Sequence, residues 1–196
     1  MLITILFADI IEFAAQLLNR DGVTKSDDWA SQEDGLMNSD DSAIQFGVVP
    51  PGIAKTMSGL QLLTGIIEGT LPAPPIQKAL DFRPVEVARG FITFVGNPKF
   101  EYYNPLGSVH GGYTAALLDS CMACAIHSTL EAGYSYATIE IKINYVRSIT
   151  CETGEVRAEG KVINSGKRIA TGEGRLFDSA GKLYAHGTTT CLILTL

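Results

Sequence analysis

The sequence of 196 residues predicts an α+β domain in which an antiparallel sheet wraps around one long central helix. The segment from Gly111 to about Glu131 has helical character and no wide polar face, so other elements must cover it nearly all round. About four stretches of alternating apolar and polar residues follow it, joined by tight turns. A shorter pair of such stretches precedes it, which favours strands on both sides of the helix in the sequence.

The elements expected before the long helix are a short helix and a hairpin. In "PPGIAKTMSGLQLLTGIIEGTLPAPP" the apolar residues recur at helical spacing between Pro and Gly, and Gly69 ends the pattern. In "FRPVEVARGFITFVG" alternating apolar residues flank an Arg-Gly turn, and Asn97 with Pro98 ends this stretch. We therefore expect an amphipathic helix, a stiff turn and a β-hairpin, in that order.

Four strands are expected after the long helix, in "TIEIKINYVR", "EVRAEGKVI", "RIATGEGRLF" and "LYAHGTTTCLILTL". In the first, apolar residues alternate from Ile139 to Tyr145, which is typical of a half-buried strand. In the third, Ala170, Gly172 and Gly174 fall on one side of the strand. Their small size leaves room for a helix or a ligand to pack closely on that face.

The N-terminal residues differ in composition from the rest of the chain. Residues 1–41 hold nine acidic and two basic residues, a net charge of −7, so the other residues carry +1 of the whole chain's −6. The sequence predicts an acidic extension over residues 1–41, made of an amphipathic helix and a linker, and one domain over residues 42–196. Met37 is an alternative natural start. The opening apolar run has no positive flank and ends at Asp9, so we expect neither a signal peptide nor a membrane span.

Charge and cysteine content argue against a nucleic-acid-binding protein and against a metal-binding protein. An acidic arm on a near-neutral domain lacks the basic patch that nucleic acid requires. Four cysteines without a secretion signal indicate free thiols and a cytoplasmic location. Cys121 and Cys124 form a C-x-x-C inside a helix, and no second pair or His completes a metal set, since His127 on the same helix is more typical of a packed or surface side chain; we expect packed small residues and no metal site.

The start of the long helix has the features of an oxyanion site. Gly111 and Gly112 follow His110 where the first backbone N–H groups of a helix lack intrahelical acceptors. Such groups, at the positive end of the helix dipole, stabilise an oxygen that gains negative charge. A tight turn before a helix is the alternative interpretation of this short motif.

Asp119 is the single acid among the apolar residues of the helix. A buried carboxylate is costly unless it is paired or used in chemistry, although a structural hydrogen bond would also explain it. Nine residues along a helix separate His110 from Asp119 by about 13 Å and about 180° in direction. If both act on one carbonyl, Asp119 must meet the His110 end of a second copy, so the protein should be at least a dimer.

At this point the sequence resembles a known family. Asn104, six residues before His110, then "HGG", then Asp119, is similar to the motif of the PaaI-type acyl-CoA thioesterases of the hotdog superfamily. The resemblance extends over roughly residues 53–194 and includes "NYVRSI" and "NSGKRIATGEGRLFDSAGKLYAHGTTT". It implies a hotdog fold, a homodimer or dimer of dimers, and hydrolysis of an acyl-CoA without a metal or other cofactor.

The resemblance also implies roles for individual residues. Gly111, with Asn104 and His110 nearby, would hold and polarise the thioester carbonyl, and Asp119 of the partner subunit would act as general base or nucleophile. Thr138 falls where some members have a hydroxyl that assists the acid. Because the length of the preceding loop is uncertain by one residue, Ser135 is an alternative for this hydroxyl. Lys167 and Arg168, in a turn, are the candidates for contact with the phosphates of CoA.

The acyl group itself is not readable from the sequence. Its pocket would be shaped by residues such as Gly112, Tyr113, Leu117 and Met122, whose side-chain directions the sequence does not define. Two alternatives stay open: a hotdog hydratase or dehydratase acting on a hydroxyacyl chain, and a non-catalytic acyl-CoA-binding protein. The spacing of Asn104 and the His-Gly-Gly favours the thioesterase.

Overall fold

The computed structural model describes residues 44–196, so the predicted acidic extension lies outside the described residues. The elements before the long helix are three helices and a hairpin: α2 (Pro51–Ala54), α3 (Gly59–Ile67), α4 (Pro75–Leu80), β1 (Phe82–Ala88) and β2 (Phe91–Gly96). Helix α3 and the hairpin confirm the prediction for this part of the chain. Ser58 begins α3 with a capping box, in which its side chain and that of Gln61 each accept a backbone N–H of the other residue. Helix α4 was not predicted.

The long helix α5 (Gly111–His127) is followed by four strands: β3 (Tyr134–Tyr145), β4 (Val156–Ser165), β5 (Ile169–Asp178) and β6 (Leu183–Thr195). The four predicted strands are confirmed. The helix ends at His127, four residues before the expected end, because the hydroxyls of Ser128 and Thr129 donate to the carbonyls of Ala125 and Ile126 and close the last turn.

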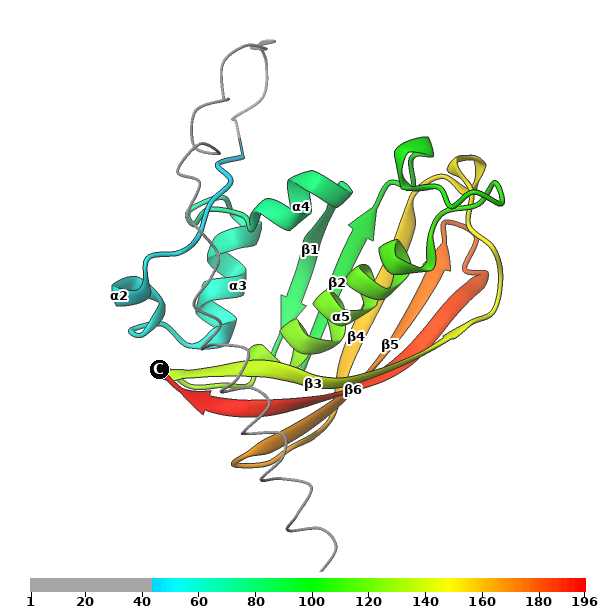
Figure 1. The fold of residues 1–196 in the computed structure, drawn as a ribbon. Coiled ribbons are helices and arrows are strands. Elements are labelled where there is room, and N and C mark those ends of the chain that lie inside the picture. Colours follow the sequence, from blue (N-terminus) through cyan, green and yellow to red (C-terminus); the bar gives the residue numbers. More distant parts are fainter. Residues whose placement is uncertain (1–43) are drawn as a thin grey trace, which may run out of the picture. The chain divides into compact units, whose positions relative to one another are not determined.

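All six strands form one antiparallel sheet in the order β1-β2-β4-β5-β6-β3, and the sheet curves around α5 (Figure 1). Two short 3-10 helices, Phe100–Tyr102 and Cys151–Thr153, lie in the connections. In this order β1 and β3 are the two edge strands of the sheet. Among the described residues, no helix is long and apolar enough to cross a membrane.

The helix and the sheet approach closely where the sequence has small residues. A Cβ at Gly160 of β4 would lie 2.1 Å from the carbonyl oxygen of Cys121, and one at Gly174 of β5 would lie 2.7 Å from the side chain of Met122. The predicted close packing of a helix on the small-residue face is therefore confirmed. Cys121 and Met122 are fully buried here and belong to the main apolar core.

The expectation that β3 is half-buried is wrong for a single chain. Ile139 is 58% exposed and Tyr145 is 55% exposed, although the sequence alternates as predicted. Two features explain this. Strand β3 has a neighbour on one side only, and a bulge between Thr138 and Glu140 interrupts its register with β6.

Candidate active site

His110 forms the N-cap of α5. Its Nδ1 accepts a hydrogen bond from the backbone N–H of Gly112 at 2.8 Å, and its carbonyl accepts from the N–H of Tyr113 at 3.0 Å. When the neutral ring accepts at Nδ1, the proton is on Nε2, which is then available as a donor to another group. The exposed His110 side chain therefore both begins the helix and presents an N–H at its start.

The backbone N–H of Gly111 has no acceptor among the described residues, whereas the N–H of Gly112 is bonded to His110. The carbonyl of Gly111 accepts a hydrogen bond from the hydroxyl of Tyr145 at 3.0 Å, and a Cβ at Gly111 would lie 3.3 Å from the Tyr145 ring. Of the two predicted amide donors, the structure thus leaves the one at Gly111 open for a ligand at the positive end of the helix.

A cleft of about 310 Å³ lies beside Gly111. Its lining includes Tyr145 and Arg147, and the Arg147 guanidinium also donates to the backbone carbonyl of Leu183. The sequence reading did not single out either residue. In the sequence, Tyr145 is one position of an apolar alternation, and only the fold reveals its contact with the start of α5.

The side chain of Asn104 hydrogen bonds to residues of its own loop. Its Oδ1 accepts from the N–H groups of Leu106 and Ser108, at 2.9 and 3.3 Å, and its Nδ2 donates to the hydroxyl of Ser108 at 3.0 Å. Because a carboxamide nitrogen carries two hydrogens, one N–H of Asn104 remains for another acceptor. The observed contacts make Asn104 a support for the loop that leads into His110.

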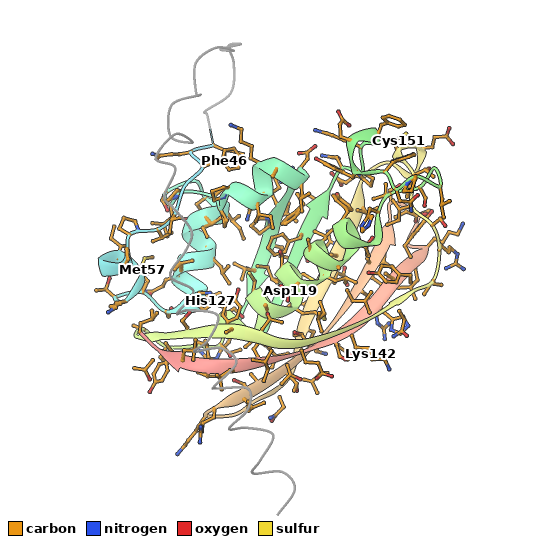
Figure 2. The ribbon with its side chains drawn as sticks, in the orientation of Figure 1. Phe46, Met57, Asp119, His127, Lys142 and Cys151 are labelled. Atoms are coloured by element: carbon orange, nitrogen blue, oxygen red, sulfur yellow. The ribbon has the colours of Figure 1, made fainter. Side chains whose placement is uncertain are left out.

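Asp119 lies midway along α5 and is half-buried, next to β3 (Figure 2). The hydroxyl of Thr138 donates a hydrogen bond to its Oδ1 at 3.0 Å. Thr138 is therefore the hydroxyl beside the acid, and no hydrogen bond joins Ser135 to Asp119 among the described residues. The bulge that follows Thr138 is a feature often found next to active sites, where it redirects a side chain.

The two halves of the predicted site are separate within one chain. Gly111 and Asp119 lie on one uninterrupted helix, about 12 Å apart at its rise per residue. Gly111 lines the cleft beside Tyr145, whereas Thr138, the partner of Asp119, lines a different cleft of about 390 Å³. One chain therefore presents the open N–H of Gly111 in one place and the carboxylate of Asp119 in another.

Three other predicted contacts, Tyr113, Lys167 and Arg168, do not line the cleft at the start of α5. Tyr113 is 3% exposed and stacks on Tyr102 with ring centroids 5.0 Å apart, so it faces the core; burial raises the pKa of its hydroxyl. Lys167 and Arg168 are exposed in the turn between β4 and β5. At that end of the sheet the hydroxyl of Ser165 lies 3.2 Å from that of Thr129, just beyond the C-terminal end of α5.

None of these three residues lies beside the open N–H of Gly111 within one chain. Tyr113 does not line either of the two clefts described above. Lys167 and Arg168 lie near the opposite end of α5 from Gly111, so within one chain they do not join the oxyanion donor. Arg147 is the basic side chain that lines the Gly111 cleft.

Comparison with known proteins finds similarity to thioesterases over part of the chain. Residues 106–185 match the family model described as thioesterase superfamily. The 1,4-dihydroxy-2-naphthoyl-CoA hydrolase of Escherichia coli (strain K12) is 31% identical over 90 residues, which cover 46% of this chain and 65% of that enzyme. The matched segment thus spans less than two thirds of the length of the relative.

Solved structures share the fold. A phenylacetic acid degradation-related protein of Ralstonia eutropha JMP134 superposes with a TM-score of 0.61 and 26% identity, covering 66% of this chain and 98% of that one. The PaaI protein of E. coli, from the phenylacetic acid degradation operon, has a TM-score of 0.60 and 18% identity, covering 71% and 96%. The sheet wrapped around α5 is the hotdog fold, and residues 106–185 are similar to the thioesterase superfamily.

Proposed function

We propose that the protein hydrolyses an acyl-CoA thioester to a carboxylic acid and CoA, at a site shared by two copies of the chain. The observation that carries the proposal is the hydrogen bond from Thr138 to the half-buried Asp119, next to an apolar cleft. The family match and the relative that is named as a CoA thioester hydrolase support the reaction class.

The residues at the start of α5 suit the first step of this reaction. When water, or the carboxylate itself, attacks the thioester carbonyl, negative charge develops on the carbonyl oxygen. The open N–H of Gly111 would donate to that oxygen, assisted by the Nε2–H of His110. As the tetrahedral intermediate collapses, the C–S bond breaks and the sulfur of CoA leaves with the bonding electron pair.

Asp119 of the partner subunit would supply the base or the nucleophile. As a base it takes a proton from the attacking water; as a nucleophile it forms an anhydride that water then cleaves. The hydrogen bond from Thr138 holds one carboxylate oxygen in place and leaves the other free to react. Both routes consume one water and require no metal or redox group.

The exposed edge strand supports the assembly of two copies. Strand β3 presents apolar side chains, Ile139 and Ile141 among them, on an unpaired edge, which is a template for pairing with another strand. Pairing two such edges would set the two α5 helices side by side, with Asp119 of each near Gly111 of the other.

The exposed Arg147 in the Gly111 cleft is then a candidate contact for the phosphates of CoA. We infer a cytoplasmic location, where CoA thioesters are formed and the free thiols stay reduced.

Hydrolysis of a panel of short, long and aromatic acyl-CoAs, followed by release of the CoA thiol, tests the proposal. We expect release from at least one acyl class by the unmodified protein and much slower release by the Asp119→Asn variant. Binding of acyl-CoAs without thiol release would contradict hydrolysis and favour a non-catalytic binding protein.

A further inference from the structure

The second cleft, of about 390 Å³, lies between the two edges of the sheet. Side chains from α3, α4, β1, β2, α5 and β3 line it, and most of them are apolar. Thr138, which bonds to Asp119, is part of this lining. Because its volume is within the range of small-molecule pockets, about 300 to 1,000 Å³, the cleft can receive an acyl group that extends from a carbonyl at Asp119.

Gln77 of α4 is a buried polar residue in this lining. It is 8% exposed; its backbone N–H donates to the carbonyl of Pro74, whereas its carboxamide has no hydrogen-bond partner among the residues that the structure describes. Among the described residues, the Tyr113 hydroxyl is the only fully buried side-chain N or O without a partner, so the Gln77 carboxamide still reaches solvent and is open to a ligand. Strand β3, with Thr138, forms one side of the cleft, and α4 with Pro84 of β1 forms another. Gln77 also borders two neighbouring clefts that contain Arg83, one of them with Lys78 and Asp81, but none of these charged residues lines this cleft.

The helical wall of the cleft is fixed in place. The N–H of Gly59, the first residue of α3, donates to the carbonyl of Leu130 at 3.0 Å. A Cβ at Gly59 would lie 1.8 Å from the carbonyl oxygen of His127, so only glycine allows this approach. Leu63 of α3 is buried in the main core. The wall of the cleft is thus part of the folded domain.

The polar groups around the cleft are uncharged. No Lys, Arg, Asp or Glu lines it. His127, labelled at the end of α5 in Figure 2, lies against Tyr136 with ring centroids 5.2 Å apart, and burial lowers its pKa. Burial also raises the pKa of the Cys124 thiol to about 12, so that thiol stays protonated. These groups suit a neutral hydrogen-bonding partner better than a carboxylate or an ammonium group.

We propose that Gln77 determines substrate specificity by hydrogen bonding an uncharged polar substituent, such as a hydroxyl, on the part of the acyl group remote from the thioester. The inference rests on the proposed hydrolysis and adds the class of acyl group to it. Helices α3 and α4 lie outside residues 106–185, so the segment that matches the thioesterase superfamily does not contain Gln77.

Pairs of thioesters that differ by one hydroxyl test this role: phenylacetyl-CoA with 4-hydroxyphenylacetyl-CoA, and hexanoyl-CoA with 6-hydroxyhexanoyl-CoA. Affinities are measured by calorimetry on the full chain carrying Asp119→Asn, which prevents turnover during the titration. We expect the hydroxylated member of at least one pair to bind about tenfold more tightly, the value of one good hydrogen bond. Adding Gln77→Met should bring that ratio to about one and should leave the melting temperature within a few degrees, because the carboxamide makes no hydrogen bond with a described residue and still reaches solvent.

Lys78→Met is the matched control, since it introduces the same side chain at the next, exposed position of α4, outside this cleft. The affinity ratio should be unchanged in this variant. Gln77→Leu repeats the test with a shorter apolar side chain. A ratio of one for both pairs in the Asp119→Asn protein, or a ratio that survives both substitutions of Gln77, would overturn the role of Gln77.

The thiol-release assay on the unmodified protein separates this inference from the proposed function. Hydrolysis without any hydroxyl preference would overturn the role of Gln77 and leave hydrolysis standing. A hydroxyl preference in binding that depends on Gln77, together with no thiol release from any of the four thioesters or the wider panel, would overturn hydrolysis and leave the role of Gln77 in place.

Discussion

Thr138 lies on the edge strand β3 and Asp119 on the central helix α5, and the Thr138 hydroxyl donates to the Asp119 carboxylate at 3.0 Å. The hydroxyl can donate only one hydrogen, and the carboxylate receives it on one oxygen. The orientation of the acid is therefore set by the strand, while the helix sets its position. Both residues have separable effects that substitution can measure.

Replacing Asp119 by Asn keeps the size of the side chain and removes the base. We expect kcat for thioester hydrolysis to fall by about 10²- to 10⁴-fold, the usual contribution of a general base, with an unchanged melting temperature within a few degrees. Steady-state kinetics and thermal unfolding measure the two quantities. Turnover like that of the unmodified protein would show that Asp119 is structural.

Replacing Thr138 by Val removes the hydrogen bond to Asp119 and keeps a β-branched strand residue. Because hydrogen bonds to charged groups contribute about 1.5 to 3 kcal/mol, we expect kcat to fall by roughly 10- to 100-fold. Thr138→Ser retains the hydroxyl and should recover most of the activity. If Val and Ser variants lose stability but keep the same kcat, the hydroxyl does not orient the acid.

At the scale of elements, the strands and α5 were predictable because alternation and an all-round apolar helix are local properties of the sequence. Helix α4 was not, because "PIQKAL" has six residues within a Pro-rich stretch and too few apolar positions to show a period. The directions of Tyr113 and Tyr145 depend on which elements pack against them. The motif placed Asp119 and Gly111 on one helix, but only the fold shows that Thr138 reaches the acid and that Asn104 is engaged in its own loop.

The close contact between α5 and β4 makes a specific prediction about stability. Gly160→Ala would place a Cβ 2.1 Å from the carbonyl oxygen of Cys121, so the helix and strand must separate. We expect the free energy of unfolding to fall by about 1 to 3 kcal/mol, measured by urea denaturation. Gly52→Ala in α2 is the control, since no atom lies within 4 Å of its Cβ position, and should change stability by less than about 0.5 kcal/mol. Equal effects at both positions would contradict the packing account.

At the scale of the whole molecule, the six-stranded sheet and every candidate site residue fall within residues 44–196. We therefore expect a chain that starts at Met37 to keep the kcat/KM and the melting temperature of the full protein. Kinetics and thermal unfolding of the two chains side by side measure this. A truncated chain that is inactive or unfolded would show that residues 1–36 contribute to the domain.

The second prediction at this scale concerns the shared site, and Gly111→Pro supplies the variant that it needs. Proline is favoured at the first position of a helix and removes the N–H, and the backbone of His110, with φ −59° and ψ 136°, is of the kind that precedes proline. Loss of one oxyanion donor typically costs about 10²- to 10³-fold in kcat. A Gly111→Pro chain and an Asp119→Asn chain are then each deficient in a different half of the site.

Mixing these two chains under conditions of subunit exchange tests the central claim most directly. In a mixed dimer, one site receives Gly111 from the Asp119→Asn chain and Asp119 from the Gly111→Pro chain. Equal amounts should recover about a quarter of the activity of the unmodified protein, since half of the dimers are mixed and each has one complete site. If subunit exchange is demonstrated and the mixture stays as inactive as its parents, the site is not shared between chains.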